Sequence, residues 1–245
     1  MIKKKERIHF VQKDVSLFKY LHAYKVARLD QIERDIFQNV NRKTLYWRLK
    51  KLERHHYLTC RYGLNQGNKK VFSITKKTFD QFLQRGDERR MEFASDAIDH
   101  DLNLVDIHFM FGKSSKVLEY LTENQLQTWG DYLKDKSMLP MVELRCDAAI
   151  KVKLPNGIYW LAIEYEATSK SIGRYKEILQ KLYGTIGLTT VLYICGDDAI
   201  KNKIVEAESK LYSNERPLIY YQTLKALREH PLNIFINRIG RKIHL

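Results

Sequence analysis

Two β-rich runs joined by a tight-turn sequence constrain the fold of this chain more than any other feature. Residues 141–153 and 158–166 are rich in apolar and β-branched side chains, and the turn residues Leu154, Pro155, Asn156 and Gly157 stand between them. Proline and Asn-Gly supply the backbone conformations that a tight turn requires, so the two runs are predicted to pair as an antiparallel hairpin. A β-sheet is therefore expected in the second part of the chain.

The segments around this hairpin indicate a mixed α/β domain. Residues 100–111 carry apolar side chains on one helical face, and this helix is expected to continue, after a break at Gly112, toward Leu121. After the hairpin, helical and strand-like segments alternate, at residues 172–183, 189–195, 197–211 and 218–221. The predicted order is helix, hairpin, helix, strand, which is the order of the PD-(D/E)XK nuclease core.

The first part of the chain has a different pattern, in which short helices precede a second hairpin. Periodicity predicts helices at 16–24, 29–37 and 42–56, strands at 57–62 and 71–74, and a closing short helix at 76–83. The turn of this hairpin is expected at residues 65–68. The order is that of a winged helix-turn-helix, and the fold class is therefore α+β, with a winged helix at 1–95 and a nuclease-like domain at 96–245.

The third helix of the first part is the predicted recognition helix. Its buried stripe is expected at Leu45, Leu49 and Leu52, since these share one face at about 100° per residue. The remaining cations and aromatics are the candidate DNA-binding residues: Arg42, Lys43, Tyr46, Trp47, Lys50 and Arg54 on the helix, and Lys69 and Lys70 at the hairpin tip. A core position for Trp47 is the alternative.

The positive charge of the chain is concentrated in its first part. The formal net charge is +14; residues 1–95 hold 23 Lys and Arg against 10 Asp and Glu, or +13, which leaves +1 for residues 96–245. A concentrated basic surface attracts a polyanion and releases its counterions, so double-stranded DNA is the expected partner. The alternative is a solvated basic face with no partner.

Cysteine usage and hydropathy exclude two other classes of protein. The three cysteines are scattered, which is typical of reduced thiols in the cytoplasm and not of a disulfide framework, and no zinc-ligand spacing is present. No apolar stretch approaches the roughly 20 residues that a membrane span requires. A cytoplasmic protein without a membrane span is therefore expected.

Three carboxylates on the hairpin of the second part suggest a metal site. Asp147 lies on its first strand, and Glu164 and Glu166 lie two apart on its second strand, on one face. Carboxylates held together repel one another unless a cation compensates them, and Mg²⁺ or Mn²⁺ is the usual cation for clustered oxygen ligands. The alternative is that the acids are merely solvated.

The motifs around these acids resemble the replication-relaxation family, and most closely its MobC-type plasmid relaxases. They are His100-Asp101-Leu102 at the start of a helix, Arg145 to Ile150, Ala162 to Glu166, Ser169-Lys170-Ser171 and Arg174-Tyr175-Lys176. That family also couples an N-terminal winged helix to a restriction-enzyme-like domain, so the resemblance spans both halves. It implies metal-dependent nicking of one DNA strand at a plasmid transfer origin, with relaxosome accessory proteins as further partners.

The resemblance also implies roles for individual residues. Asp147 and Glu164 would be metal ligands, and Glu166 a further ligand or the group that orients the attacking water. The nuclease pattern has a lysine where this chain has Glu166, so the cation that stabilises the scissile phosphate is expected from Lys170, Arg174 or Lys176. Tyr175 offers a hydroxyl for a covalent mechanism, which is the less favoured route. His100 and Asp101 are weaker candidates for which helix capping is an equal alternative.

Two other functions stay open at the level of sequence. The missing lysine suggests a non-catalytic DNA-binding accessory protein or replication regulator with a degenerate nuclease fold. A transcription regulator whose second domain only dimerises is the third reading.

Overall fold

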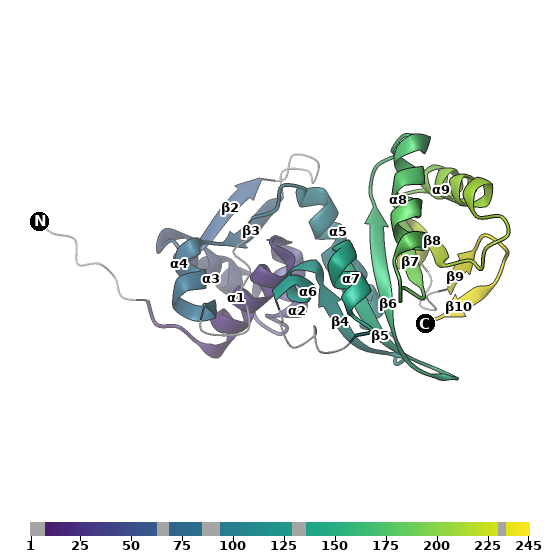
Figure 1. The fold of residues 1–245 in the computed structure, drawn as a ribbon. Coiled ribbons are helices and arrows are strands. Elements are labelled where there is room, and N and C mark those ends of the chain that lie inside the picture. Colours follow the sequence, from purple (N-terminus) through teal and green to yellow (C-terminus); the bar gives the residue numbers. More distant parts are fainter. Residues whose placement is uncertain (1–7, 63–68, 85–93, 129–135, 230–233) are drawn as a thin grey trace, which may run out of the picture. The chain divides into compact units, whose positions relative to one another are not determined.

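A computed structural model describes residues 8–62, 69–84, 94–128, 136–229 and 234–245, and the chain divides into two compact units, Met1–Leu102 and Asn103–Leu245 (Figure 1). The fold is mixed α+β. The division falls inside helix α5 (Ile98–Phe111), seven residues beyond the boundary expected after residue 95. The polar residues 84–96 suggest a linker or a solvated connecting helix, and residues 85–93 of this stretch lie outside the described residues.

The first unit combines short helices with a small antiparallel sheet. Its elements are α1 (Gln12–Tyr24), β1 (Ala27–Arg28), α2 (Leu29–Asp35), α3 (Arg42–Arg54), β2 (Leu58–Tyr62), β3 (Lys70–Ile74), α4 (Lys76–Thr78) and the π-helical turn η2 (Phe79–Leu83). The three strands described there pair in the order β1-β3-β2. Strand β1 was not expected from the sequence. The predicted hairpin turn at 65–68 lies outside the described residues.

Capping side chains set the starts of the helices in this unit. Helix α1 begins four residues before the predicted Ser16, because the Asp14 carboxylate accepts the backbone N–H of Val11 at 2.8 Å. Asn41 accepts the N–H of Lys43 at 2.9 Å and starts α3 at the predicted residue. The predicted stripe of Leu45, Leu49 and Leu52 is fully buried and is confirmed as the core face of α3.

The segment after β3 is a short α-helix followed by a π-helical turn, and not one regular helix. Thr75 caps α4 by accepting the N–H of Thr78 at 3.3 Å. The chain then widens into the π-helical turn, where Gln84 N–H reaches the carbonyl of Phe79 at 2.9 Å. Both Phe79 and Leu83 are thereby buried in the core of the unit.

The second unit is built on one mixed sheet. Its elements after α5 are β4 (Val117–Thr122), α6 (Glu123–Thr128), α7 (Leu139–Leu144), β5 (Ala148–Leu154), β6 (Gly157–Glu166), α8 (Ile172–Gly184), β7 (Val191–Cys195), α9 (Asp198–Leu211), β8 (Ile219–Thr223), α10 (Leu224–Glu229), β9 (Ile234–Asn237) and β10 (Lys242–His244). The described strands form a seven-stranded sheet in the order β10-β9-β8-β7-β6-β5-β4. Strands β6, β7 and β8 are parallel, and the other neighbours are antiparallel.

Helices cover both faces of this sheet. One core cluster packs residues of α6, α7, α8 and α9 against side chains such as Ala162 and Tyr193, and α8 and α9 lie on the same side in Figure 1. A second cluster packs α5 and α10 against the other face, at Ile150 and Ile163 among others. Because both faces are buried, alternate residues of β6 and β7 enter different clusters.

Two sequence predictions for this unit are wrong. Helix α5 does not continue past Gly112; β4 follows instead and pairs with β5, with Tyr120 opposite Ile150. Residues Met141 to Leu144 belong to α7 and not to a strand, because Pro140 stands in the first turn of this helix and Arg145 ends it in a left-handed conformation (φ 56°). The predicted hairpin itself is confirmed, with Leu154 opposite Gly157.

The described part of the chain contains no helix that is long and apolar enough to cross a bilayer.

Candidate functional site

Asp147 is fixed at the point where β5 begins. It stands between α7 and β5, and its backbone carbonyl accepts the N–H of Glu123 at 2.9 Å. Its Oδ2 atom accepts the backbone N–H of Tyr165 in β6 at 2.7 Å. The last β5–β6 pair is Ala148 with Ile163, so Asp147 and Glu164 occupy the next opposite positions. The sequence placed Asp147 on the strand, and the structure places it one residue before.

Glu164 and Glu166 lie near the end of β6 on one face of the sheet. Glu164 is in register with Tyr193 of β7, and Glu166 with Cys195. Burial raises the pKa of Tyr193 well above its ordinary value, and the negative charges of Glu164, Glu166 and Asp147 raise it further. All three carboxylates therefore disfavour ionisation of this one buried tyrosine.

Cys146 is a buried neighbour of these acids that the sequence did not suggest. Burial is the largest cause that raises the pKa of its thiol, followed by the negative charge of Glu164 and a hydrogen bond to that side chain. The thiol is therefore held protonated and serves as a hydrogen-bond partner of Glu164. No sequence spacing singles out this cysteine, because its contact with Glu164 depends on the pairing of β5 with β6.

Lys170 is a cation that the structure brings to Glu166. Its ammonium forms an ion pair with Glu166, whose side chain is 5% exposed against 39% for Lys170. The backbone N–H of Lys170 donates to the Tyr175 hydroxyl at 2.9 Å. Of the cations considered from sequence, Lys170 thus pairs with Glu166.

Tyr175 has the environment of a structural residue. Its side chain is fully buried, and its hydroxyl accepts the N–H of Lys170. Burial is the largest cause that raises its pKa, which disfavours the phenolate that a covalent attack on phosphorus needs. This environment gives no support to the covalent route.

Arg174 and Lys176 are exposed on α8. Arg174 pairs with Glu177 at 2.7 Å, and both side chains are more than half exposed. His100 and Asp101 lie in the first turns of α5, where the His100 Nδ1 atom is 3.1 Å from Asp101 Oδ1.

A short segment between β6 and α8 is held against β7 and α9. Gly196 N–H donates to the Glu166 carbonyl at 2.8 Å, and a Cβ atom on Gly196 would stand 2.9 Å from the Ala167 carbonyl oxygen. Lys203 of α9 donates to the Ser169 hydroxyl at 2.8 Å. Lys203 is 34 residues from Ser169, so no sequence motif could have connected them. These contacts fix the segment that carries Lys170.

Asp147 and Glu164 could act as two ligands of a divalent cation. No set of three or more His, Cys, Asp or Glu side chains that could hold a metal ion occurs among residues whose placement is described. Mg²⁺ does not need such a set, because it keeps several waters and takes about one or two carboxylates together with substrate phosphate. Asp147 and Glu164 on neighbouring strands fit this mode, whereas Glu166 already contacts the Lys170 ammonium.

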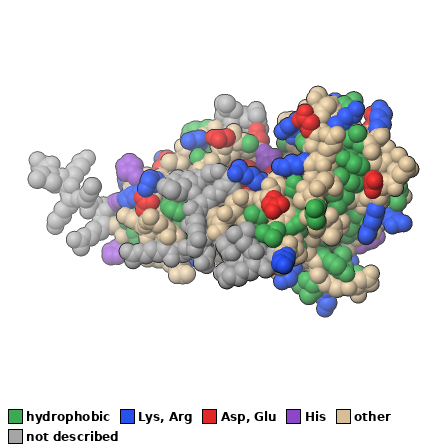
Figure 2. All heavy atoms as spheres, in the orientation of Figure 1, with side chains coloured by type: hydrophobic (Ala, Val, Ile, Leu, Met, Phe, Trp, Pro, Cys, Tyr) green, Lys and Arg blue, Asp and Glu red, His purple; other side chains and the backbone are tan. Residues whose placement is uncertain are grey.

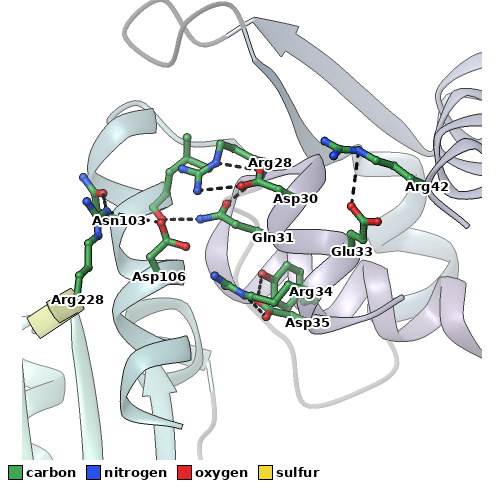
Figure 3. A network of polar contacts seen from close by, with 12 residues as sticks. Arg28, Asp30, Gln31, Glu33, Arg34, Asp35, Arg42, Asn103, Asp106 and Arg228 are labelled. Atoms are coloured by element: carbon green, nitrogen blue, oxygen red, sulfur yellow. Dashed lines mark hydrogen bonds and ion pairs between the residues drawn. The ribbon is translucent and has the colours of Figure 1, made fainter. Parts of the chain in front are cut away.

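A polar cluster extends from β6 on the opposite face of the sheet. Asn103 of α5 donates to the Tyr165 hydroxyl at 3.0 Å. It accepts a hydrogen bond from Arg228 of α10 at 3.1 Å (Figure 3). Arg228 also lies 3.7 Å from Asp106. Tyr165 is therefore held at its hydroxyl by Asn103 and at its N–H by Asp147.

The candidate DNA-binding residues of the first unit lie at its surface. Arg42, Lys43, Trp47, Arg54 and Lys69 are exposed, and Tyr46, Lys50 and Lys70 are partly exposed. Trp47 is 57% exposed, which excludes the alternative of a core position. Arg42 reaches back to Glu33 of α2 at 3.7 Å, as Figure 3 shows. The described residues of this helix thus present cations and an aromatic ring to solvent.

Lys70 joins the second hairpin strand to α3. Its ammonium donates to the Tyr46 hydroxyl at 3.0 Å and lies 4.9 Å from the centre of the Tyr46 ring. This hydrogen bond is the largest cause that lowers the pKa of Tyr46, and it raises the pKa of Lys70. The strand and the helix therefore share one cationic and aromatic surface.

The second unit has no comparable excess of cations. On the face drawn in Figure 2, Lys and Arg side chains of this unit lie among Asp, Glu and apolar side chains. This agrees with the nearly neutral balance of residues 96–245, which hold 20 Lys and Arg against 19 Asp and Glu.

No protein-family model, no curated protein and no solved structure matches this chain.

Proposed function

We propose that this chain is a DNA-binding protein in which a winged helix recognises the DNA site and a PD-(D/E)XK-like unit cleaves one strand in a metal-dependent reaction. The order α1, β1, α2, α3 and the β2–β3 hairpin supports the winged helix. The exposed cations of α3 and of Lys69 and Lys70 suit a major groove and its phosphates.

The single observation that carries the cleavage proposal is the placement of Asp147 opposite Glu164. Glu164 lies on β6 and Asp147 directly before the adjacent strand β5, and the bond from Tyr165 N–H to Asp147 fixes one carboxylate. Helix α5, the β5–β6 hairpin, α8 and β7 occur along the chain in the order of the nuclease core. This order supports the proposal of a PD-(D/E)XK-like unit. Two preorganised carboxylates at a strand end are the chemistry that a divalent ion requires.

Each side chain of the candidate site would have a separate role in cleavage. Asp147 and Glu164 would hold Mg²⁺ or Mn²⁺, which when bound polarises a phosphodiester and activates water. Lys170, held by Glu166 and by the segment pinned to β7 and α9, would place positive charge beside the scissile phosphate. Glu166 sets the position of the Lys170 ammonium in this scheme.

The biological setting is proposed from the family resemblance alone. A MobC-type relaxase nicks plasmid DNA at a transfer origin to begin conjugative mobilisation, and it works with relaxosome accessory proteins. We propose that role for this chain, with double-stranded DNA of the origin region as its substrate.

A nicking assay tests the proposal. Supercoiled plasmid carrying the transfer origin is incubated with the protein and Mg²⁺ or Mn²⁺, and open circles are expected for the wild type. Asp147→Ala and Glu164→Ala should lose nicking by at least about 100-fold while they still bind DNA, since each removes a ligand. Glu143→Ala, an exposed acid of α7, is the matched control and should nick normally. Equal nicking by all four proteins would rule out the site.

A second candidate is a non-catalytic DNA-binding regulator. The observation that favours it is the ion pair between Glu166 and Lys170, which neutralises the third acid without any metal ion. This candidate predicts specific DNA binding and no conversion of supercoiled plasmid under any metal. A transcription regulator that dimerises through its second unit predicts the same absence of nicking.

A further inference from the structure

A continuous row of rings and ammonium groups crosses the surface of the first unit. Trp47 and Tyr46 on α3 have ring centres 6.2 Å apart. The Lys70 ammonium lies 4.9 Å from the Tyr46 ring and 5.8 Å from the Tyr62 ring at the end of β2. The Lys50 ammonium lies 5.7 Å from the centre of the same Tyr46 ring. The row therefore runs from α3 across β3 to β2.

The two ends of this row are unusually open to solvent. Trp47 is 57% exposed and Tyr62 is 60% exposed, whereas Phe18, Phe72 and Phe79 in the same unit are at most 3% exposed. Leaving a large ring in water forgoes the stabilisation that its burial would give. Contacts to phosphate do not explain these rings, because lysine and arginine make such contacts without them.

We propose that Trp47 and Tyr62 stack on unpaired bases, so that this face binds DNA whose strands are locally separated in preference to intact duplex. Base faces in a duplex are covered by their neighbours, and only edges remain in the grooves. Unpaired bases expose their faces, and proteins that bind them combine aromatic platforms with cations along the backbone. The Lys70 ammonium lies near both the Tyr46 and Tyr62 rings, and Lys50 lies beside Tyr46, so both can contact the phosphates of such a strand.

This inference rests on the proposed DNA binding of the first unit and not on cleavage by the second. It assigns Tyr62, which the recognition-helix scheme leaves unused, and it gives Trp47 a ligand. It also specifies the substrate class, namely a duplex that contains a run of unpaired bases. A nicking protein that binds separated strands would have the strand it cleaves already unpaired and accessible.

The test compares two fluorescent DNA probes by anisotropy with the full chain. One probe is a short duplex, and the other is the same duplex with a central run of mismatched bases. The wild type should bind the mismatched probe more tightly. Trp47→Ala and Tyr62→Ala should each weaken binding of the mismatched probe by roughly 5- to 150-fold, the range that loss of one stacked base gives. Binding of the duplex by Tyr62→Ala should change by less than about threefold, because Tyr62 is not part of the recognition helix.

Two further variants separate stacking from other causes. Tyr62→Phe keeps the ring and should bind the mismatched probe as the wild type does. Tyr159→Ala removes an exposed tyrosine from the second unit and should leave both probes unaffected. Equal losses for the two probes, or a Tyr62→Phe variant as weak as Tyr62→Ala, would overturn base stacking. A wild type that binds neither probe would overturn the proposed DNA binding together with it.

Discussion

At the scale of single residues, Glu166 and Lys170 are where this chain differs from the PD-(D/E)XK pattern. The pattern has a lysine two residues after the second acid, where this chain has Glu166. The ammonium instead comes from four residues further on and pairs with Glu166 itself. A buried carboxylate needs such a partner, because an uncompensated charge away from water is costly. Lys170 therefore places a positive charge beside Glu166, although it occupies a different position in the sequence from the lysine of the nuclease pattern.

Arg48 neutralises a buried carboxylate of the first unit, that of Asp14. The Asp14 side chain is fully buried, and Arg48 Nε donates to its Oδ1 at 2.9 Å. We expect Arg48→Ala to lower the free energy of unfolding by about 3–5 kcal/mol, since it leaves a buried carboxylate unpaired. Urea denaturation of the full chain measures the change. Arg54→Ala, at an exposed position of the same helix, should change it by less than about 0.5 kcal/mol; equal effects would contradict the assignment.

His108 makes the second unit sensitive to acid. Its ring stacks on Tyr120 with centres 4.1 Å apart, and burial lowers its pKa to about 4. The unfolded chain binds this proton near pH 6.5, so the contribution to stability is complete above that pH and is lost as pH falls toward 4. We expect unfolding free energy to fall by at most on the order of 2 kcal/mol between pH 7 and pH 5 from this group.

The variant His108→Phe keeps a stacking ring and has no proton to gain. Its loss of stability between pH 7 and pH 5, followed by urea denaturation, should therefore be smaller than that of the wild type. An identical loss in the two proteins would show that His108 does not carry the effect.

At the scale of elements, the approach of β7 to the segment after β6 positions Lys170. Gly196 permits this approach, because a Cβ atom there would stand 2.9 Å from the Ala167 carbonyl oxygen. We expect Gly196→Ala to push the segment away, to lower stability by about 1–3 kcal/mol and to reduce nicking. Denaturation and the plasmid assay measure the two effects.

Gly184 provides the matched control for this substitution. A Cβ atom there would meet nothing within 4 Å, so Gly184→Ala should leave nicking unchanged. Full activity and stability in Gly196→Ala would contradict the proposed role of the close approach.

The sequence predicted those elements whose signal is local. The stripe of Leu45, Leu49 and Leu52 and the turn before Gly157 each depend on neighbours in the chain, and both are confirmed. The sequence predicts that the helix continues toward Leu121, because the apolar content of this stretch suits either type of element. Residues 117–122 form a strand because β5 offers an edge to pair with, which is tertiary information.

The candidate site divides in the same way. The two-residue spacing of Glu164 and Glu166 places them on one face, and the predicted hairpin brings Asp147 opposite Glu164. Cys146, Tyr193 and Lys203 reach the site only through pairing and packing of elements distant in sequence, so no motif indicates them. The role of Lys170 was suggested by its place after β6, but its partner Glu166 became evident only in three dimensions.

At the scale of the whole molecule, the charge asymmetry predicts how DNA binding responds to salt. Each lysine that contacts a phosphate contributes about 0.9 to the slope of log K against log salt concentration. We expect Lys43→Ala to reduce this slope by about one unit. Lys225→Ala, an 81% exposed lysine of the second unit, should leave it unchanged. Equal slopes for all three proteins would contradict binding through the first unit.

The most direct test of the central claim is a crystal structure of the protein soaked with Mn²⁺, using anomalous scattering to locate the ion. We predict one peak within coordination distance of both Asp147 and Glu164, with Lys170 still paired to Glu166, and no such peak in Asp147→Asn. Well-ordered carboxylates with no ion between them at saturating Mn²⁺ would contradict the metal site and leave the first unit as the functional part of the chain.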